Sequence, residues 1–188
     1  MVLVDTADRE VGTAPKQEAH RSGLLHRAFS VFVFDRAGTL LLQRRARVKY
    51  HSGGLWTNTC CGHPRPGEPV TAAATRRLRE EMGFACDLAV VGTFTYRAPV
   101  SDDLVEHELD HVLVGHHDGV PVPDPAEVDA WRRSPVSDLL RALRRTPDHF
   151  TAWFPLAFAV ALGGNPTLPA APEARQDRSG TREQRSTR

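Results

Sequence analysis

Residues 56–84, WTNTCCGHPRPGEPVTAAATRRLREEMGF, decide the fold of this chain. A short strand-like run leads into the turn-rich segment GHPRPGEP, and a helical pattern follows. Pro69 stands where the first turn of a helix tolerates proline, and Gly83 is placed to end the helix. A Gly- and Pro-rich loop before a helix is typical of anion binding, because free N–H groups and the positive end of the helix dipole converge there.

The charged side chains of this helix are spaced so that they form pairs. Arg76 and Glu80 are four residues apart, as are Arg77 and Glu81, so each pair shares a helix face. Taken alone, this spacing indicates two solvated ion pairs worth about 0.3–0.5 kcal/mol each.

The wider spacing is similar to the Nudix box, GX5EX7REUXEEXGU with U apolar, in which a loop–helix–loop unit holds a divalent metal on a diphosphate. The matching positions are Gly62, Glu68, Arg76, Leu78, Glu80, Glu81 and Gly83. One position departs, because Arg77 stands where the box has glutamate. A cation there weakens a hydrolytic site that uses several metals and favours direct pairing with a phosphate.

Length and composition are those of an ordinary globular protein. The chain has 188 residues, 40% hydrophobic and 25% charged, which fits one well-buried domain. A net charge of +1 gives no reason to expect nucleic acid or an anionic membrane as a partner. Three cysteines, an odd number, argue against a disulfide framework and favour a reducing cytoplasm. The first ten residues lack the pattern of a secretory signal, which favours the same location.

Apolar patterns and turn signals predict the remaining elements. We expect strands at residues 1–4, 26–34, 39–43, 57–61, 88–96 and 104–114, loops at 16–25 and 97–103, and helices at 137–145 and 150–162. Residues 163–188 contain no aromatic side chain but three prolines and five arginines, so we expect a disordered tail after a single domain at 1–162.

Alternation along residues 57–61 separates two adjacent cysteines. Successive side chains of a strand point to opposite faces, so Cys61 shares a face with Thr57 and Thr59 while Cys60 takes the other. The two cysteines are therefore predicted to differ in role, one facing the candidate site and one facing the packed interior.

Charge gathers in two further places. Glu106, Glu108 and Asp110 line one face of the strand at 104–114, where they repel one another unless a positive group or a metal lies against them. The alternative is a solvated edge strand. A basic cluster, Arg44, Arg45, Arg47 and Lys49, follows the strand at 39–43 and is either solvated surface or an anion clamp.

Six segments in order carry a more specific resemblance: HRAFSVFVFD, LLLQRRA, GLWTNTCCGHP, RRLREEMG, FTYRA and VEHELDHV. Together they resemble type I isopentenyl diphosphate isomerases, enzymes of isoprenoid biosynthesis with a Nudix fold. The resemblance covers residues 1–162. It implies an α+β fold, with a mixed central sheet flanked by helices, and isomerisation of isopentenyl diphosphate to dimethylallyl diphosphate.

The resemblance also implies roles for individual residues. One Mn²⁺ or Zn²⁺ is held by three histidines and two glutamates, which match His20, His26, His63, Glu106 and Glu108; only five residues separate His20 from His26, about one fewer than in the family. A Mg²⁺ bound with the diphosphate is held by Glu81 and the backbone carbonyl of Cys61. The diphosphate clamp matches Lys16, Arg45, Lys49 and Arg77, and the catalytic set matches Cys61, Glu108, Tyr96 and Trp153.

The implied chemistry is a proton shift on an unactivated alkene, which requires an acid, a base across the substrate and exclusion of water. We expect a small prenyl diphosphate as the partner, no nucleic acid or membrane, and a monomer or weak homodimer. Three alternatives remain: a Nudix pyrophosphohydrolase, a non-catalytic metal- or diphosphate-binding module, and an isomerase homologue acting on another prenyl diphosphate.

Overall fold

The computed structural model describes residues 1–101 and 103–164. Within them nine strands share one sheet: β1 Val2–Val4, β2 Glu10–Thr13, β3 His26–Phe34, β4 Thr39–Arg45, β5 Trp56–Thr57, β6 Cys60–Gly62, β7 Leu88–Ser101, β8 Leu104–His116 and β9 Val128–Pro135. The helices are α1 Lys16–Ser22, α2 Val70–Met82, α3 Val136–Arg145 and α4 Phe154–Ala161, with a 3₁₀ turn, η1, at Pro147–His149.

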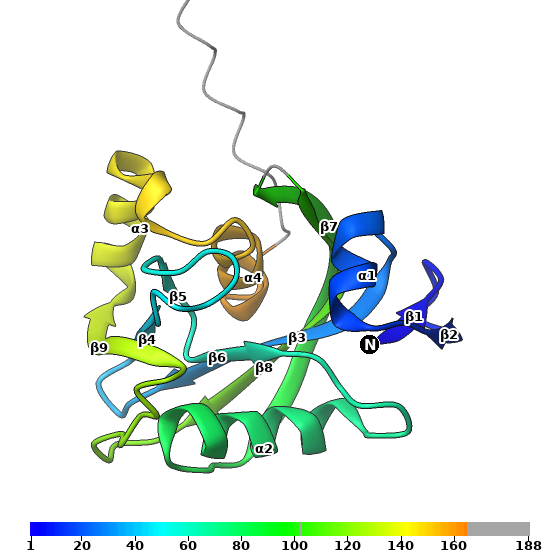
Figure 1. Cartoon of the computed structure of the whole chain (residues 1–188). Helices are drawn as coiled ribbons and strands as arrows, with labels where there is room; N and C mark the ends of the chain where they lie inside the picture. Colours follow the sequence, from blue (N-terminus) through cyan, green and yellow to red (C-terminus); the bar gives the residue numbers. More distant parts are fainter. Residues whose placement is uncertain (102, 165–188) are drawn as a thin grey trace, which may run out of the picture.

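The sheet is organised around β3, in which every residue except Arg27 is buried. On one edge β3 pairs with β8 in parallel over its whole length. On the other edge it pairs antiparallel with β1, β6 and β4 in turn. Figure 1 shows α2 along one face of this sheet and α4 against the opposite face. The mixed sheet with helices on both faces confirms the predicted α+β class.

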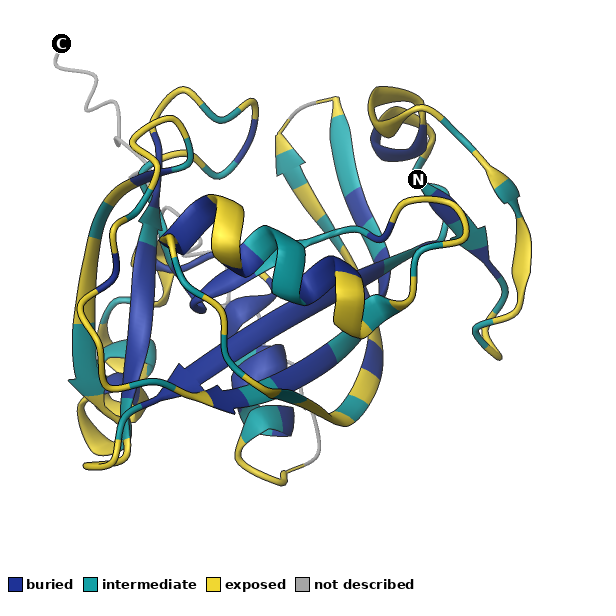
Figure 2. Cartoon of the chain, turned by 90° about the horizontal axis from the view of Figure 1, so that it is seen from below, coloured by how far each residue is buried: buried dark blue, intermediate teal, exposed yellow. Residues whose placement is uncertain are grey.

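The side chains of β3 divide between two apolar clusters. Phe29, Val31 and Val33 pack with α2, whereas Phe32 and Phe34 pack with α4. Burial on both faces explains why the sequence of this strand is a continuous apolar run rather than an alternating one. The central strands and the inner side of α2 are accordingly buried in Figure 2, and the outer turns and loops are exposed.

The helix of the Nudix-like stretch lies where the sequence predicts it. Pro69 caps α2, and Gly83 ends it in the left-handed conformation with φ +76°. A Cβ on Gly83 would lie 2.3 Å from the carbonyl oxygen of Val122, so both the backbone angle and the space require glycine. Ala73, Leu78 and Met82 face the core, which turns the Arg77–Glu81 side toward the end of β6.

Several predicted boundaries are wrong. Residues 16–22 form α1 rather than a loop, because a helix of seven residues is too short to show an apolar period. Strand β7 continues through residues 97–101, since its hairpin with β8 pairs as far as Ser101 and Leu104. The last helix begins at Phe154 rather than at residue 150, because Pro155 belongs in a first turn.

Two further differences lie near the site. The predicted strand at 57–61 is two short strands, β5 and β6, separated by Asn58 and Thr59. The side chain of Asn58 donates to the carbonyl oxygen of Cys60, and the hydroxyl of Thr59 donates to the carbonyl oxygen of Leu41 on β4. Strand β8 is not a solvated edge, since it lies between β3 and β7. No helix among the described residues is long and apolar enough to cross a membrane. The tail predicted at 163–188 falls outside the described residues, apart from Gly163 and Gly164.

Candidate active site

The structure contains a cavity of about 450 Å³. It is lined from separate parts of the chain, with Cys61 on β6, Glu81 on α2, Glu108 on β8 and Trp153 at the start of α4. The same face of β3 and β8 carries apolar side chains toward α4 and polar ones toward the cavity, which include Ser30 and Asp110. Alternation within β8 brings Glu106, Glu108 and Asp110 to the cavity together.

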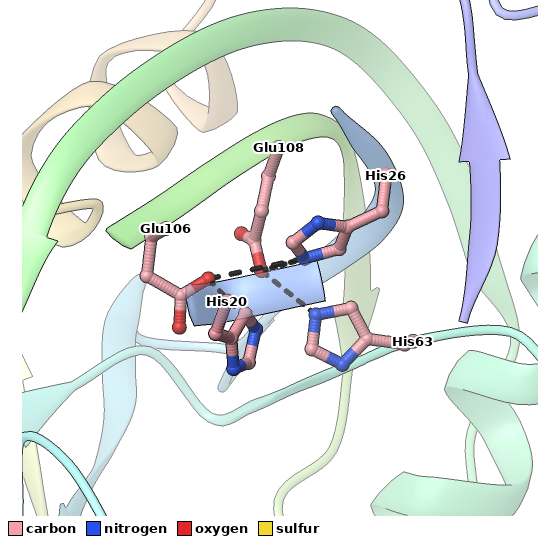
Figure 3. A group of neighbouring side chains, drawn as sticks. All are labelled: His20, His26, His63, Glu106 and Glu108. Atoms are coloured by element: carbon pink, nitrogen blue, oxygen red, sulfur yellow. Dashed lines mark hydrogen bonds and ion pairs between the residues drawn. The ribbon is translucent and has the colours of Figure 1, made fainter. Parts of the chain in front are cut away.

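The five candidate metal ligands lie close together (Figure 3), and three of them, His63, Glu106 and Glu108, line the cavity. One nitrogen or oxygen from each of them lies within 4.8 Å of all the others; the residues are His20, His26, His63, Glu106 and Glu108. They come from α1, β3, β8 and the segment after β6, so only the tertiary fold brings them together. The register places His26 opposite Glu108, which aligns β3 and β8 at this end.

Three atoms of this cluster are buried without a hydrogen-bond partner among the described residues: Nε2 of His20, Nε2 of His26 and Oε2 of Glu106. Nε2 of His20 lies 3.5 Å from Oε2 of Glu106, so these atoms face each other across a small gap. Leaving buried polar atoms unpaired is costly, and a cation among them would satisfy all three. Imidazole and carboxylate donors fit a divalent transition metal such as Mn²⁺ or Zn²⁺.

Burial and contacts between the ligands together affect protonation in the cluster. Burial acts to lower the pKa of His26, but its contacts with Glu108 and the carbonyl of Leu24 more than offset this and raise the pKa. Burial has the larger effect at His20. It lowers the pKa of His20 to about 3, so the ring is neutral and its lone pair is free at neutral pH. Burial acts to raise the pKa of Glu108, but contacts with His26, Glu106 and Tyr96 together more than offset it, and the pKa of Glu108 lies below its usual value. Neutral imidazole and ionised carboxylate are the forms that bind metals.

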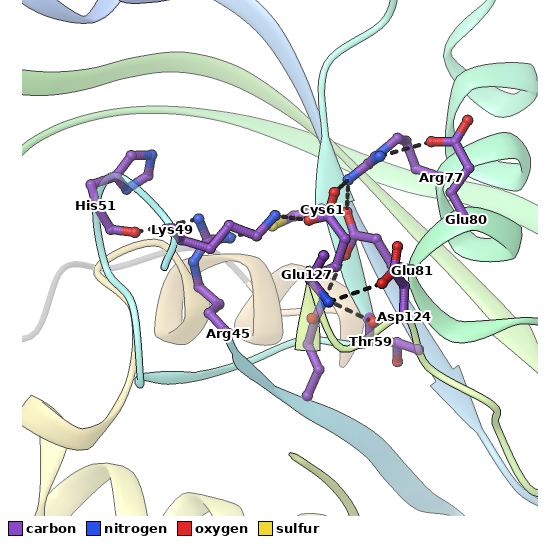
Figure 4. Close-up of polar contacts among 12 residues, drawn as sticks. Arg45, Lys49, His51, Thr59, Cys61, Arg77, Glu80, Glu81, Asp124 and Glu127 are labelled. Carbon is purple, nitrogen blue, oxygen red and sulfur yellow. Dashed lines mark hydrogen bonds and ion pairs between the residues drawn. The ribbon is translucent and has the colours of Figure 1, made fainter. Parts of the chain in front are cut away.

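The four predicted clamp cations line the same cavity, but they differ in their partners. Arg77 contacts the carboxylates of Glu80, Glu81 and Glu127, and Lys49 also contacts Glu127 (Figure 4). Lys16 lies 4.9 Å above the ring of Tyr50, and Arg45 lies 5.3 Å from the ring of Trp153. Within the described residues no carboxylate pairs with Lys16 or Arg45, so these two cations are available to an incoming anion.

Glu81 is buried, although the charged pattern of the helix predicts an exposed side chain at this position. Arg77 donates to its Oε1, and Gln43 donates to its Oε2 at 2.8 Å. The prediction of two solvated ion pairs is therefore wrong for Arg77–Glu81 and right for Arg76–Glu80, where Glu80 is exposed. A carboxylate has about four lone-pair positions, so Glu81 retains room for a hard cation such as Mg²⁺.

The two cysteines point to different environments, as alternation predicts. Cys61 lines the cavity, and Cys60 is fully buried in the cluster around α2. Burial raises the pKa of Cys61 to about 12, so it is a thiol at neutral pH. Strands β6 and β8 pair with opposite edges of β3. Cys61 on β6 and Glu108 on β8 are therefore separated by the width of β3.

The remaining predicted residues support this arrangement. Tyr96 is buried and donates a 2.7 Å hydrogen bond to Oε2 of Glu108. Trp153 is also buried, and its indole N–H donates to Asn58 at 3.2 Å, which fixes the ring beside the cavity. His63 contacts the other oxygen of Glu108, Oε1, at 2.8 Å.

Three residues near the site are not predicted from the sequence: Tyr50, His51 and Glu127. Tyr50 and His51 directly follow Lys49, and that position beside the basic cluster is a signal that could have pointed to them. The sequence does place Asp110 on one face of β8 with Glu106 and Glu108; in the structure it lines the cavity, and Ser30 donates to it at 2.7 Å. Glu127 gives no such signal, because only the packing of β9 beside β4 brings it to the clamp.

Comparison with known proteins agrees with this geometry. Residues 24–154 match the family model described as NUDIX domain. The structure of DR0079 from Deinococcus radiodurans is similar in fold, with a TM-score of 0.68 and 21% identity over 86% of this chain and 96% of that one.

Curated relatives are far more similar in sequence. A protein of Burkholderia multivorans named isopentenyl-diphosphate Delta-isomerase is 58% identical over 82% of this chain and 88% of its own length. A protein of the same name from Serratia proteamaculans is 52% identical over 88% of this chain and 92% of its own length. Another protein of this name, from Nocardia farcinica, is 52% identical over 85% of this chain and 92% of its own length. With matches of this extent and identity, the chain belongs to the isopentenyl-diphosphate Delta-isomerase family, within the NUDIX domain proteins.

Proposed function

We propose that this protein interconverts isopentenyl diphosphate and dimethylallyl diphosphate. The observation that carries the proposal is the single cavity that Cys61 and Glu108 both line, from strands on opposite edges of β3, with clamp cations and Glu81 in the same lining. A cavity of about 450 Å³ falls within the usual range for small-molecule sites.

The diphosphate is bound by Lys16, Arg45, Lys49 and Arg77. Lys16 and Arg45, which have no carboxylate partner among the described residues, receive the anion first. Lys49 and Arg77 then exchange their contacts with Glu127 for phosphate oxygens, which form strong charge-assisted hydrogen bonds. Mg²⁺ bound with the diphosphate would be held by Glu81 and the backbone carbonyl of Cys61.

Mn²⁺ or Zn²⁺ would be held by His20, His26, His63, Glu106 and Glu108. When bound, it supplies a fixed positive charge that stabilises the carboxylate form of Glu108 and orients it. Tyr96, through its hydrogen bond to Oε2, holds the same carboxylate from the other side.

Proton transfer then involves two groups of the chain. One of Cys61 and Glu108 adds a proton to the terminal alkene carbon, which leaves a tertiary carbocation at the adjacent carbon. The other removes a proton from the carbon next to the diphosphate-bearing end, which forms the internal double bond. The reverse reaction exchanges the two roles, so protons balance in both directions.

Trp153 stabilises the carbocation. Its ring is buried beside the cavity, and a desolvated cation–π contact contributes about 2 kcal/mol or more. The apolar cluster around α4 excludes water from this side, which protects the cation from capture.

The test is incubation of the purified chain with isopentenyl diphosphate and Mg²⁺ in D₂O, followed by NMR. Deuterium in dimethylallyl diphosphate supports the isomerase. Release of inorganic phosphate from nucleoside diphosphates without deuterium incorporation would establish a hydrolase instead. Tight pyrophosphate binding without either reaction would leave only a binding module, and exchange on a different prenyl diphosphate would change the substrate. We further infer that the chain acts in the cytoplasm, as a monomer or weak homodimer, and that residues 1–162 form one domain.

A further inference from the structure

Two consecutive residues after β4, Tyr50 and His51, contact two of the five candidate metal ligands, His20 and Glu106. The hydroxyl of Tyr50 contacts Nδ1 of His20, and the two rings are stacked with centroids 5.7 Å apart and an interplanar angle of 17°. Nε2 of His51 lies 3.0 Å from Oε1 of Glu106. His51 is buried, and its ring also lies edge-on to Tyr50 and to Trp153.

Each contact occupies one polar atom of a ligand candidate and leaves the other free. In His20 the contacted atom is Nδ1, and the unpartnered atom is Nε2. In Glu106 the contacted atom is Oε1, and the unpartnered atom is Oε2. The two unpartnered atoms lie 3.5 Å apart, so both point into the cluster.

His26 repeats this arrangement with a backbone partner. Its Nδ1 lies 2.8 Å from the carbonyl oxygen of Leu24, which can only accept a hydrogen bond. The ring proton of neutral His26 is therefore on Nδ1, and Nε2 keeps its lone pair. A tyrosine hydroxyl can accept in the same way, so Tyr50 can hold the proton of His20 on Nδ1 and leave its Nε2 lone pair facing inward.

We propose that Tyr50 and His51 are positioning residues that fix the ring tautomer of His20 and the carboxylate orientation of Glu106 for binding of a divalent transition metal. Outer partners of this kind orient ligands and typically contribute about 10- to 100-fold in metal affinity. The inference rests on the metal-binding part of the proposed function and extends it to two residues that contact ligands rather than the metal.

The experiment measures the affinity of the full-length protein for Zn²⁺ by competition with a chromophoric chelator. We expect Tyr50→Phe, which keeps the stacked ring but loses the hydroxyl, and His51→Ala each to weaken binding by about 10-fold. His51→Gln retains an N–H donor and should recover part of the loss. His149→Ala, which removes an exposed histidine outside the cavity lining, is the matched control and should bind Zn²⁺ as the wild type does.

A second measurement tests the mechanism directly. Nitrogen-15 NMR of the metal-free protein should show His20 as the Nδ1–H tautomer in the wild type and as a mixture in Tyr50→Phe. If Tyr50→Phe merely loosened the packing, signals across the whole spectrum would change. A change of the His20 tautomer in an otherwise unchanged spectrum therefore indicates a positioning role.

The proposal is overturned if Tyr50→Phe and His51→Ala bind Zn²⁺ as tightly as the wild type, or if the wild type binds none. Failure of the proposed isomerase reaction can be distinguished from failure of the positioning roles. A wild type that binds Zn²⁺, variants that bind it weakly, and no deuterium incorporation would together remove the isomerase but leave the positioning roles in place.

Discussion

Cys60 and Cys61 allow a prediction in which one substitution lowers stability and the other lowers turnover. Replacing each in turn with alanine removes the same atom, a sulfur, from two adjacent residues. Cys60 is fully buried among Val31, Leu41 and Leu78, whereas Cys61 borders the open cavity. The chemical change is identical, so any difference between the variants reports the environment alone.

The structure sets the expected magnitudes. Cys60→Ala leaves a hole in a packed cluster, so the free energy of unfolding should fall by about 1–2 kcal/mol. For a chain of this length that corresponds to a melting temperature lower by roughly 2–8 °C. Cys61→Ala enlarges a space that is already open, so stability should change by less than about 0.5 kcal/mol. Turnover of Cys61→Ala should fall on the order of 10²- to 10⁴-fold, which is the usual contribution of a general acid or base.

The assay combines thermal unfolding, deuterium incorporation from D₂O and calorimetric titration with pyrophosphate in the presence of Mg²⁺. We expect Cys61→Ala to bind pyrophosphate normally without turning over, and Cys60→Ala to retain most of its turnover while melting earlier. Equal losses of turnover in both variants would refute the assignment of faces. A destabilised Cys61→Ala with normal activity would refute it equally.

Three further predictions concern charge and metal. Arg77→Glu restores the glutamate of the Nudix box but removes a phosphate-binding cation, so calorimetry should show pyrophosphate affinity lower by about 10-fold or more; unchanged affinity would contradict the clamp. Excess Zn²⁺ at about 100 times its dissociation constant should raise the free energy of unfolding of the wild type by about 2.7 kcal/mol in urea titrations, and His26→Ala should lose most of this gain; equal gains would exclude His26 as a ligand. Bidentate pairing with Arg76 lowers the pKa of Glu68 to about 2 from 4.5, so its stabilising effect is present above pH 4.5 and disappears as the pH falls toward 2. Glu68→Gln should therefore be less stable than the wild type near neutrality, and urea titrations at decreasing pH should show the two converging; a difference that does not change with pH would refute the linkage.

The sequence alone determined the elements whose pattern is local. The continuous apolar run of β3, the Pro69 and Gly83 boundaries of α2 and the alternation that separates Cys60 from Cys61 all follow from backbone geometry and side-chain periodicity. The α+β class and the family were predicted correctly from motifs at fixed offsets, which comparison with known proteins then confirmed.

Tertiary structure decided what depends on distant residues. The seven residues of α1 are too few to reveal a period, yet this helix brings His20 to a cluster whose other members are as far along the chain as Glu108. Burial of Glu81 and the shared contacts of Glu127 with Lys49 and Arg77 arise from packing between elements, which no local pattern encodes. Tyr50 and His51 acquire a role for the same reason: a side chain can orient a metal ligand only where the fold places the two in contact.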